Sequence, residues 1–226
     1  MQHGIISVSI EGKMIPRLHL TTLIGVIFGI WAFFMILSGI AITSEFFKPF
    51  SLIVGIVGII LFLFDKLLWK FPIIHSLFVP FPDVSGTWRG QIISTWKNEK
   101  TGEPIEPIDA FLVIYQTYSS LNIRMITKES KSDLLSGNII QNQAGPDKIA
   151  GIYNNIPNIL VRDKSPIHYG GLLLEIHNGE KTVLEGEYWT DRDTKGTLRF
   201  DKRMKNTCDD FNSALSLLQS HRYQNL

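Results

Sequence analysis

The side chains best suited to bind a small ligand gather in one stretch near the C-terminus. The segment GEYWTDRDTKGTLRF (186–200) is typical of two β-strands joined by a tight turn, and residues 189–196 combine an aromatic ring, both signs of charge and hydroxyl groups. The candidates at the end of the first strand are Tyr188, Trp189, Thr190 and Arg192. Aromatic rings stack on nucleobases, whereas hydroxyls and guanidinium groups bind phosphate. We therefore expect a ligand site at the rim of a β-structure.

Three earlier segments carry further candidates. Trp88, early in the strand that GTWRG (86–90) predicts, can plug or line a small barrel, although a core position is the commoner use of tryptophan. Arg124 is in the middle of the alternating segment LNIRMIT, where it either faces solvent or meets a buried anion, because an unpaired guanidinium is costly to bury. Tyr153 and Asn154 could stack on a base and read its edge, or Asn154 could cap a turn.

An enzymatic function is disfavoured. Metalloprotease, serine hydrolase and phosphate-loop motifs are absent. The carboxylate pairs Glu185/Glu187 and Asp191/Asp193 each share one face of a strand, which would suit acid–base or metal chemistry, but a solvated strand face is the commoner reason for such spacing. The single cysteine, Cys208, permits neither a disulfide framework nor a cysteine-based zinc site within the chain. We expect neither a metal ion nor a cofactor.

The charge distribution argues against polymeric nucleic acid as a ligand. The formal net charge is +1; residues 1–80 hold five basic and three acidic residues, and the remainder holds 17 basic and 18 acidic residues. Binding to a phosphate backbone depends on clustered lysine and arginine. A small ligand with one or two phosphates needs only a local cation.

Two apolar runs near the N-terminus predict a transmembrane helical hairpin. Residues 20–42 contain no charge and would form a helix of about 35 Å, longer than the ~30 Å hydrocarbon core of a bilayer. Residues 46–64 form the second run, after a connection of only three residues. The flanking cations place both ends of the hairpin on the cytoplasmic side, which indicates a multi-pass membrane protein. These cations are Lys13, Arg17, Lys66 and Lys70.

The predicted organisation is a cytoplasmic N-terminus (1–17), the hairpin (18–69), a proline-rich linker (70–82) and a cytoplasmic domain (83–226). Glycines in both spans permit close helix packing. They are Gly25 and Gly29 in the first span, and Gly55 and Gly58 in the second. We favour packing within the hairpin over packing between chains.

The cytoplasmic domain is predicted to be all-β. Short alternating runs rich in Val, Ile, Tyr and Thr predict eight strands, and Asn178-Gly179 is a strong hairpin signal. The predicted strands are 84–97, 110–118, 121–128, 133–141, 147–154, 167–177, 180–190 and 196–203. Consecutive strands with brief links favour a compact eight-stranded up-and-down β-barrel, with a sandwich as the alternative.

Two segments of this domain fall outside the strand pattern. Asp209-Asp210 could cap a C-terminal helix that packs on the barrel or covers one end of it. The apolar face of this helix would consist of Phe211, Ala214, Leu215 and Leu218. Residues 155–166 form a long apolar connection, which we expect to fold over the barrel mouth as a lid.

The order of these elements resembles a known family. A two-span hairpin followed by PDVSGTWRG is similar to the SMODS-associating two-transmembrane β-barrel effectors, the CD-NTase-associated protein 15 type, of CBASS antiphage defence. Further stretches that carry the resemblance are QTYSSLNIRMITKESKSD (116–133), GIYNNIP (151–157), HYGGLLLEI (168–176) and LEGEYWTDRDTKGTLRF (184–200). Together with the spans, the resemblance covers nearly the whole chain.

The resemblance implies a function. In that family a nucleotidyltransferase makes a cyclic nucleotide that the barrel binds, and the anchored proteins then oligomerise and disrupt the inner membrane, which kills the infected cell. The implied partners are a cyclic dinucleotide from a cognate CD-NTase, the lipid bilayer and further copies of the chain. By position, the implied ligand-binding residues are Trp88, Arg124, Tyr153, Asn154, His168, Thr190 and Arg192. Side-chain chemistry predicts stacking for Trp88 and Tyr153, phosphate pairing for the arginines, and hydrogen bonding for the others.

Two alternative functions come from other classes. A membrane-tethered, lipocalin-like carrier of an apolar ligand would have an apolar lumen and no phosphate-pairing arginine. A purely structural assembly module would bind no small ligand.

Overall fold

A computed structural model of the chain describes residues 13–14, 20–39, 48–97 and 101–223. The described residues divide into two compact units. The barrel unit comprises those within Met1–Ile15, Asp83–Gln116 and Leu121–Leu226, and the helical unit comprises those within Pro16–Pro82 and Thr117–Ser120. Each unit is described below by itself.

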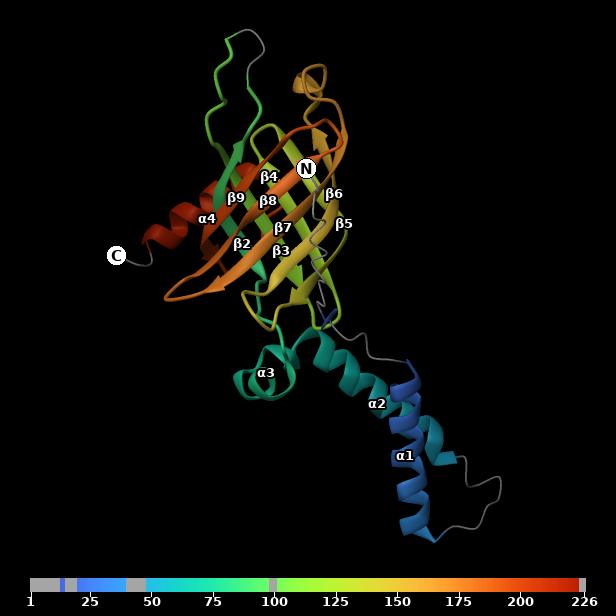
Figure 1. Ribbon diagram of the computed structural model, residues 1–226. Helices are drawn as coiled ribbons and strands as arrows, with labels where there is room; N and C mark the ends of the chain where they lie inside the picture. Colours follow the sequence, from blue (N-terminus) through green and yellow to red (C-terminus); the bar gives the residue numbers. More distant parts are fainter. Residues whose placement is uncertain (1–12, 15–19, 40–47, 98–100, 224–226) are drawn as a thin grey trace. The chain divides into compact units, whose positions relative to one another are not determined.

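The barrel unit contains a closed antiparallel β-barrel, which confirms the eight-stranded prediction (Figure 1). Its strands are β2 (Gly86–Ser94), β3 (Ile108–Gln116), β4 (Leu121–Thr127), β5 (Ser130–Gln141), β6 (Lys148–Pro157), β7 (His168–Asn178), β8 (Thr182–Thr190) and β9 (Lys195–Met204). Each strand pairs with the next one in the chain, and pairing of β9 with β2 closes the ring. A two-residue strand, β1 (Lys13–Met14), pairs with the end of β5.

The barrel lumen is filled by side chains. Residues that are opposite one another in an antiparallel register point to the same face of the sheet. Trp88 is opposite Leu112, and Leu174 is opposite Gly186; both pairs are at inward positions. Large apolar side chains occupy these positions and are buried. They leave a cavity of only about 10 Å³, close to the space that one water molecule needs. Its lining residues are Leu112, Ile123, Met125, Ser132, Leu134, Tyr153 and Leu172.

The C-terminal helix, α4 (Phe211–Tyr223), packs on the outer wall of the barrel. Asp210 caps its first turn, because the Asp210 carboxylate accepts hydrogen bonds from the Ser213 amide at 3.0 Å and the Ser213 hydroxyl at 2.6 Å. Ala214 is buried against Phe111 and Val113 of β3. The helix is confirmed, but its predicted apolar face is wrong at Leu215, which is exposed, and Leu217 packs on the cluster instead.

The helical unit contains α1 (Leu20–Ser38), α2 (Lys48–Lys66), a 3₁₀ turn η2 (Leu68–Lys70) and α3 (Pro72–Phe78). The sequence predicted 70–82 as a linker too short and too proline-broken for a third span, and the structure forms the short helix α3 within it. Pro72 is compatible with this helix because it occupies the first turn, where a missing amide proton costs nothing. Within the described residues, no helical stretch is both long and apolar enough to span a bilayer.

The residues Thr117–Ser120 are held within the helical unit by polar and aromatic contacts. The Asp65 carboxylate accepts hydrogen bonds from the Ser119 amide at 2.9 Å and from the Thr117 hydroxyl at 3.2 Å. The Tyr118 ring packs against the Phe64 ring with 4.9 Å between centroids. These contacts explain why the turn belongs to the helical unit even though it joins β3 to β4.

Candidate functional site

One end of the barrel brings together four of the seven predicted ligand-binding residues. The end of β6, the start of β7 and the β8–β9 turn meet there. Tyr153 is opposite Gly170, and Gly170 is opposite Thr190, so these three positions form one row on the inner face. His168, opposite Asn155, lies one row nearer the rim, and Arg192 follows in the turn. We call this end of the barrel the mouth.

Two glycines allow tyrosine rings to lie flat on the inner wall near the mouth. A Cβ built on Gly170 would be 2.5 Å from both Cζ and Oη of Tyr153, so the ring occupies the space that a side chain would fill. A Cβ on Gly196 would be 2.8 Å from Cε1 of Tyr188. The Tyr153 ring, which is buried, therefore packs flat on Gly170, and the partly exposed Tyr188 ring packs on Gly196.

Short hydrogen bonds order the polar groups of the mouth. The Thr190 and Thr194 hydroxyls are 2.6 Å apart, and the Arg192 amide donates to the Thr190 hydroxyl at 3.2 Å. Nδ2 of Asn155 donates to the Ser132 hydroxyl at 2.8 Å. These bonds fix the rim turn and one row of the inner wall.

Arg192 is a cation at the mouth whose charge is available to a ligand. Arg192 makes no ion pair among the described residues; its guanidinium only approaches the Ser165 hydroxyl at 3.5 Å. Burial raises the pKa of the Tyr153 phenol. The nearby Tyr188 and Asp191 raise this pKa further, whereas Arg192 lowers it. Tyr153 is therefore a neutral hydrogen-bond donor throughout the physiological pH range.

His168 is held in its neutral form. Burial lowers the pKa of its imidazole and Arg192 lowers it further, against the opposing effects of the Pro166 carbonyl and Asp191. Nδ1 is 3.0 Å from the Pro166 carbonyl oxygen, which can only accept, so Nδ1 carries the proton.

The lowered pKa of His168 predicts a loss of stability in acid. At a pH between the lowered pKa of folded His168 and the ordinary value of about 6.5, the unfolded chain binds more protons than the folded chain. The stability that neutral His168 contributes is therefore fully present above about pH 6.5 and is lost as the pH falls. We expect Tm of the full chain in detergent to fall between pH 7.5 and 5.5, by about 2–4 °C for each kcal/mol lost. The fall in Tm should be smaller in His168→Asn, which removes the titrating imidazole but keeps a hydrogen-bond donor near the position of Nδ1. The exposed His177→Asn is the control, and an equal effect of both variants would contradict the prediction.

Trp88 is not part of the mouth. It lies near the opposite end of the lumen, where it is fully buried and its indole N–H donates to the Val84 carbonyl at 2.9 Å. The Arg203 guanidinium lies 5.4 Å from the ring centroid. These contacts give Trp88 a core position, the commoner alternative at the sequence level.

Arg124 and Asn154 face away from the lumen. Ser132 lines the lumen cavity, so its neighbour Asp133 points outward, and both Arg124 and Asn154 are opposite Asp133. Arg124 Nε donates to the Asp133 carboxylate at 2.6 Å, which raises the pKa of the guanidinium. The Asn154 side-chain carbonyl is buried without a hydrogen-bond partner among the described residues. Neither residue can contact a ligand held at the mouth.

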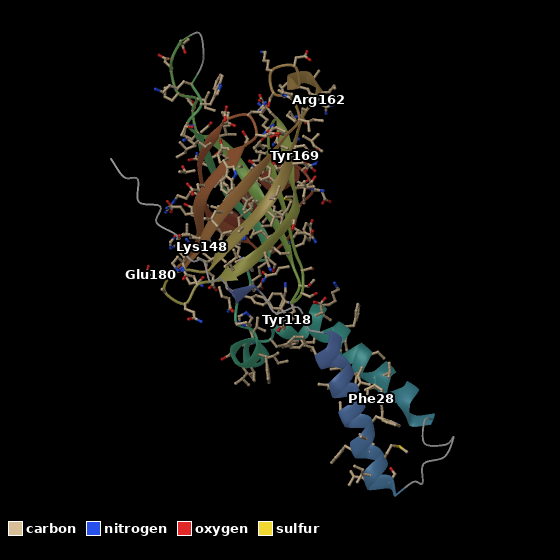
Figure 2. All side chains as sticks on the ribbon, turned by 45° about the vertical axis from the view of Figure 1, so that its right-hand side comes forward. Phe28, Tyr118, Lys148, Arg162, Tyr169 and Glu180 are labelled. Carbon is tan, nitrogen blue, oxygen red and sulfur yellow. The ribbon has the colours of Figure 1, made fainter. Side chains whose placement is uncertain are left out.

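The apolar side chains of the loop expected to act as a lid are not buried. β6 continues to Pro157, and a short 3₁₀ helix, η3 (Ile159–Val161), follows. Ile159 and Leu160 are exposed, which contradicts the expectation that they would be buried. In Figure 2, Arg162 of this loop marks the mouth end of the barrel and Glu180 the opposite end.

The outer wall has a second hollow, of about 250 Å³, at the bulge that β2 and β9 share. It is lined by Arg89, Gly90, Gln91, Ile93, Arg199, Asp201 and Lys202. Both arginines already have carboxylate partners, because Arg89 is 3.4 Å from Asp109 and Arg199 is paired with Glu185. The charges of these two arginines are therefore already partly neutralised. Among the described residues no group of three His, Cys, Asp or Glu side chains could hold a metal ion.

Fold and site together define a small barrel that presents a polar, aromatic mouth to a ligand. Residues 79–202 match the family described as "Cap15, cyclic dinucleotide receptor domain", and the chain belongs to this family. It is also similar to the CD-NTase-associated protein 15 of Staphylococcus schleiferi, with 26% identity over 140 residues, which cover 62% of this chain and 70% of that protein. The resemblance drawn from the sequence is confirmed.

Proposed function

We propose that this chain is a CBASS effector whose barrel binds a cyclic dinucleotide at the mouth. The observation that carries the proposal is the convergence of Tyr153, His168, Thr190 and Arg192 at one end of a barrel whose family is a cyclic dinucleotide receptor. The ligand comes from a cognate CD-NTase. The chain acts as a receptor and not as an enzyme.

The chemistry of the mouth assigns the roles. The tyrosine rings on Gly170 and Gly196 stack on bases, Arg192 pairs with a phosphate, and the Thr190 hydroxyl and the His168 imidazole form hydrogen bonds. Because the lumen cavity is only about 10 Å³, a ligand the size of a cyclic dinucleotide sits at the rim. The same small volume disfavours the lipocalin-like carrier, which needs an empty apolar lumen.

The helical unit supports a membrane role in this proposal. Large apolar side chains on both helices are exposed, among them Phe28, Phe33 and Phe34 on α1 and Leu52 and Ile59 on α2. A Cβ added at Gly25, Gly29, Gly55 or Gly58 would meet no described atom within 4 Å. This open space beside the glycines supports packing against other chains in this proposal. We infer that α1 and α2 anchor the chain in the inner membrane, and that ligand-driven self-association of the hairpins disrupts it.

Titration of the full chain in lipid nanodiscs with a panel of cyclic di- and trinucleotides tests the receptor role. We expect one member to bind with micromolar or tighter affinity, and to release dye from vesicles that carry the protein. Gly25→Leu combined with Gly29→Leu should keep the affinity and lose the leakage. No binding by folded protein across the panel would contradict the receptor role, and unchanged leakage of the double variant would contradict the helix-packing role.

A further inference from the structure

Three polar side chains form a row across the inner wall at the mouth. Ser132 on β5 is opposite Asn155 on β6, and Asn155 is opposite His168 on β7. All three are buried, with exposed fractions of 4%, 8% and 8%. We call them the polar row; Figure 2 labels Tyr169, the residue after His168, in the half of the barrel nearer the mouth. Polar groups buried in an otherwise apolar lumen need hydrogen-bond partners, so the question is which of their atoms still lack one.

Hydrogen bonds fix the direction of the Asn155 amide. Its Nδ2 donates to the Ser132 hydroxyl at 2.8 Å and to the Ser130 hydroxyl at 3.2 Å. The Thr127 hydroxyl donates to the Ser130 carbonyl at 3.3 Å and lies 3.0 Å from the Ser130 hydroxyl. The Ser130 hydroxyl therefore gives its own proton to Thr127 and accepts from Asn155. Both amide protons are used, and the side-chain oxygen Oδ1 of Asn155 makes no hydrogen bond among the described residues.

The imidazole of His168 supplies a second acceptor on the neighbouring strand. Its Nδ1 proton goes to the Pro166 carbonyl at 3.0 Å, and burial lowers the pKa of the ring, so Nε2 is an unprotonated acceptor. Nε2 makes no hydrogen bond within the part of the chain that the structure describes. Because Asn155 and His168 are directly opposite in the register, their Cβ atoms are about 4.5–5.5 Å apart and their side chains share the inner face.

Two neighbouring acceptors select a ligand group that brings two hydrogens. They repel the oxygens of a phosphate, and a ribose hydroxyl or the ring N–H of uracil has a single hydrogen to give. The exocyclic amino groups of adenine, guanine and cytosine have two. An amino nitrogen that donates to two acceptors at about 2.9 Å, along N–H bonds about 120° apart, needs those acceptors about 5 Å apart, which is the spacing of directly opposite side chains.

We propose that the polar row binds the exocyclic amino group of a nucleobase, with Oδ1 of Asn155 and Nε2 of His168 as the two acceptors. The inference rests on the proposed function and names the class of base at this position: adenine, guanine or cytosine, and not uracil. Ser132 is a positioning residue, because it holds the amide with Oδ1 free. A base without an amino group leaves both acceptors unpaired in a buried place, which penalises its binding.

Removing the amino group from the ligand tests the proposal on the wild-type chain. The full chain in nanodiscs is titrated calorimetrically with the panel of cyclic nucleotides, which includes all-adenine, all-guanine, all-cytosine and all-uracil members. The tightest binder is then compared with its analogue that lacks the amino group: purine riboside for adenosine, inosine for guanosine, or 2-pyrimidinone riboside for cytidine. We expect the all-uracil member to bind weakest, and the analogue to bind at least about tenfold more weakly than its parent.

Asn155→Leu removes the acceptor at similar volume and completes a double-mutant cycle with the ligand pair. The variant should bind the amino-bearing ligand at least about tenfold more weakly than the wild type does, and the analogue within about threefold of the wild type. Asn158→Leu is the matched control, because Asn158 is exposed and its amide donates to the Lys128 carbonyl. It should keep the full difference between ligand and analogue. Tm of each variant shows that it is folded.

The outcomes separate failure of this inference from failure of the proposed function. If no panel member binds to folded protein, the proposed function fails and the inference falls with it. If a member binds, but the all-uracil member binds as tightly or the analogue binds within about threefold of its parent, the inference alone is overturned. The same holds if removal of the amino group costs equal affinity in the wild type and in Asn155→Leu. The ligand comparison on the wild type decides the matter even if Asn155→Leu does not fold.

Discussion

Replacing Trp88 by alanine is expected to lower the free energy of unfolding by about 3–5 kcal/mol, the usual cost of removing a large aromatic side chain from a packed core. Trp88 is fully buried, its indole N–H donates to the Val84 carbonyl, and the Arg203 guanidinium lies over the ring. The variant should also leave Arg203 without its aromatic partner. Urea unfolding of the full chain in detergent, followed by circular dichroism, measures the change.

Trp88→Phe separates a core role from a ligand-binding role. It keeps an aromatic ring but removes the indole donor, so the buried Val84 carbonyl loses its partner at a cost of about 1–3 kcal/mol. Because Trp88 lies far from the mouth, nucleotide affinity should stay within about twofold of the wild type. A loss of affinity above tenfold in folded Trp88→Phe would return Trp88 to the ligand site that the sequence predicted.

The barrel could be predicted because its signal is local. Alternating apolar residues and turn residues recur along the chain, and a one-residue slip would expose every inward side chain, so the strands are strongly specified. The prediction missed α3 within 70–82, because the prolines of that segment were taken as helix breakers although Pro72 occupies a first turn. It also expected the apolar side chains of the 155–166 connection to be buried, whereas Leu160 is exposed.

The candidate site was predicted in part, and strand parity explains the rest. Tyr153 and Asn154 are consecutive residues of β6, so they cannot both face the lumen, and Asn155 takes the inward position next to Tyr153. Sequence alternation alone could have found this. The direction of Arg124 could not be found in the same way, because its strand has apolar residues on both faces: Ile126 packs on the α4 cluster outside, and Ile123 and Met125 line the lumen.

Arg192→Ala is expected to weaken cyclic nucleotide binding by about 10- to 150-fold. A hydrogen bond to a charged group contributes about 1.5–3 kcal/mol, and every 1.4 kcal/mol is tenfold in affinity. Arg192 makes no ion pair among the described residues of the barrel, so its removal should leave no carboxylate unpaired and should cost little stability. Calorimetric titration of the full chain in nanodiscs measures the loss of affinity. Repeating it at a second salt concentration shows how far salt screens the interaction between Arg192 and the phosphate.

Arg124→Ala is the matched control. The sequence predicts phosphate pairing for both arginines, whereas in the structure Arg192 lies at the mouth and Arg124 points outward from the barrel wall. Arg124 is paired with Asp133 on the outer wall, and removing it should cost at most about 1 kcal/mol of stability, as is usual for a partly exposed pair, and leave affinity unchanged. A larger loss of affinity in Arg124→Ala than in Arg192→Ala would move the phosphate site from the mouth to the outer wall. The tyrosines on Gly170 and Gly196 would then serve the packing of the lumen alone, and the nucleotide would bind where the structure now places a salt bridge.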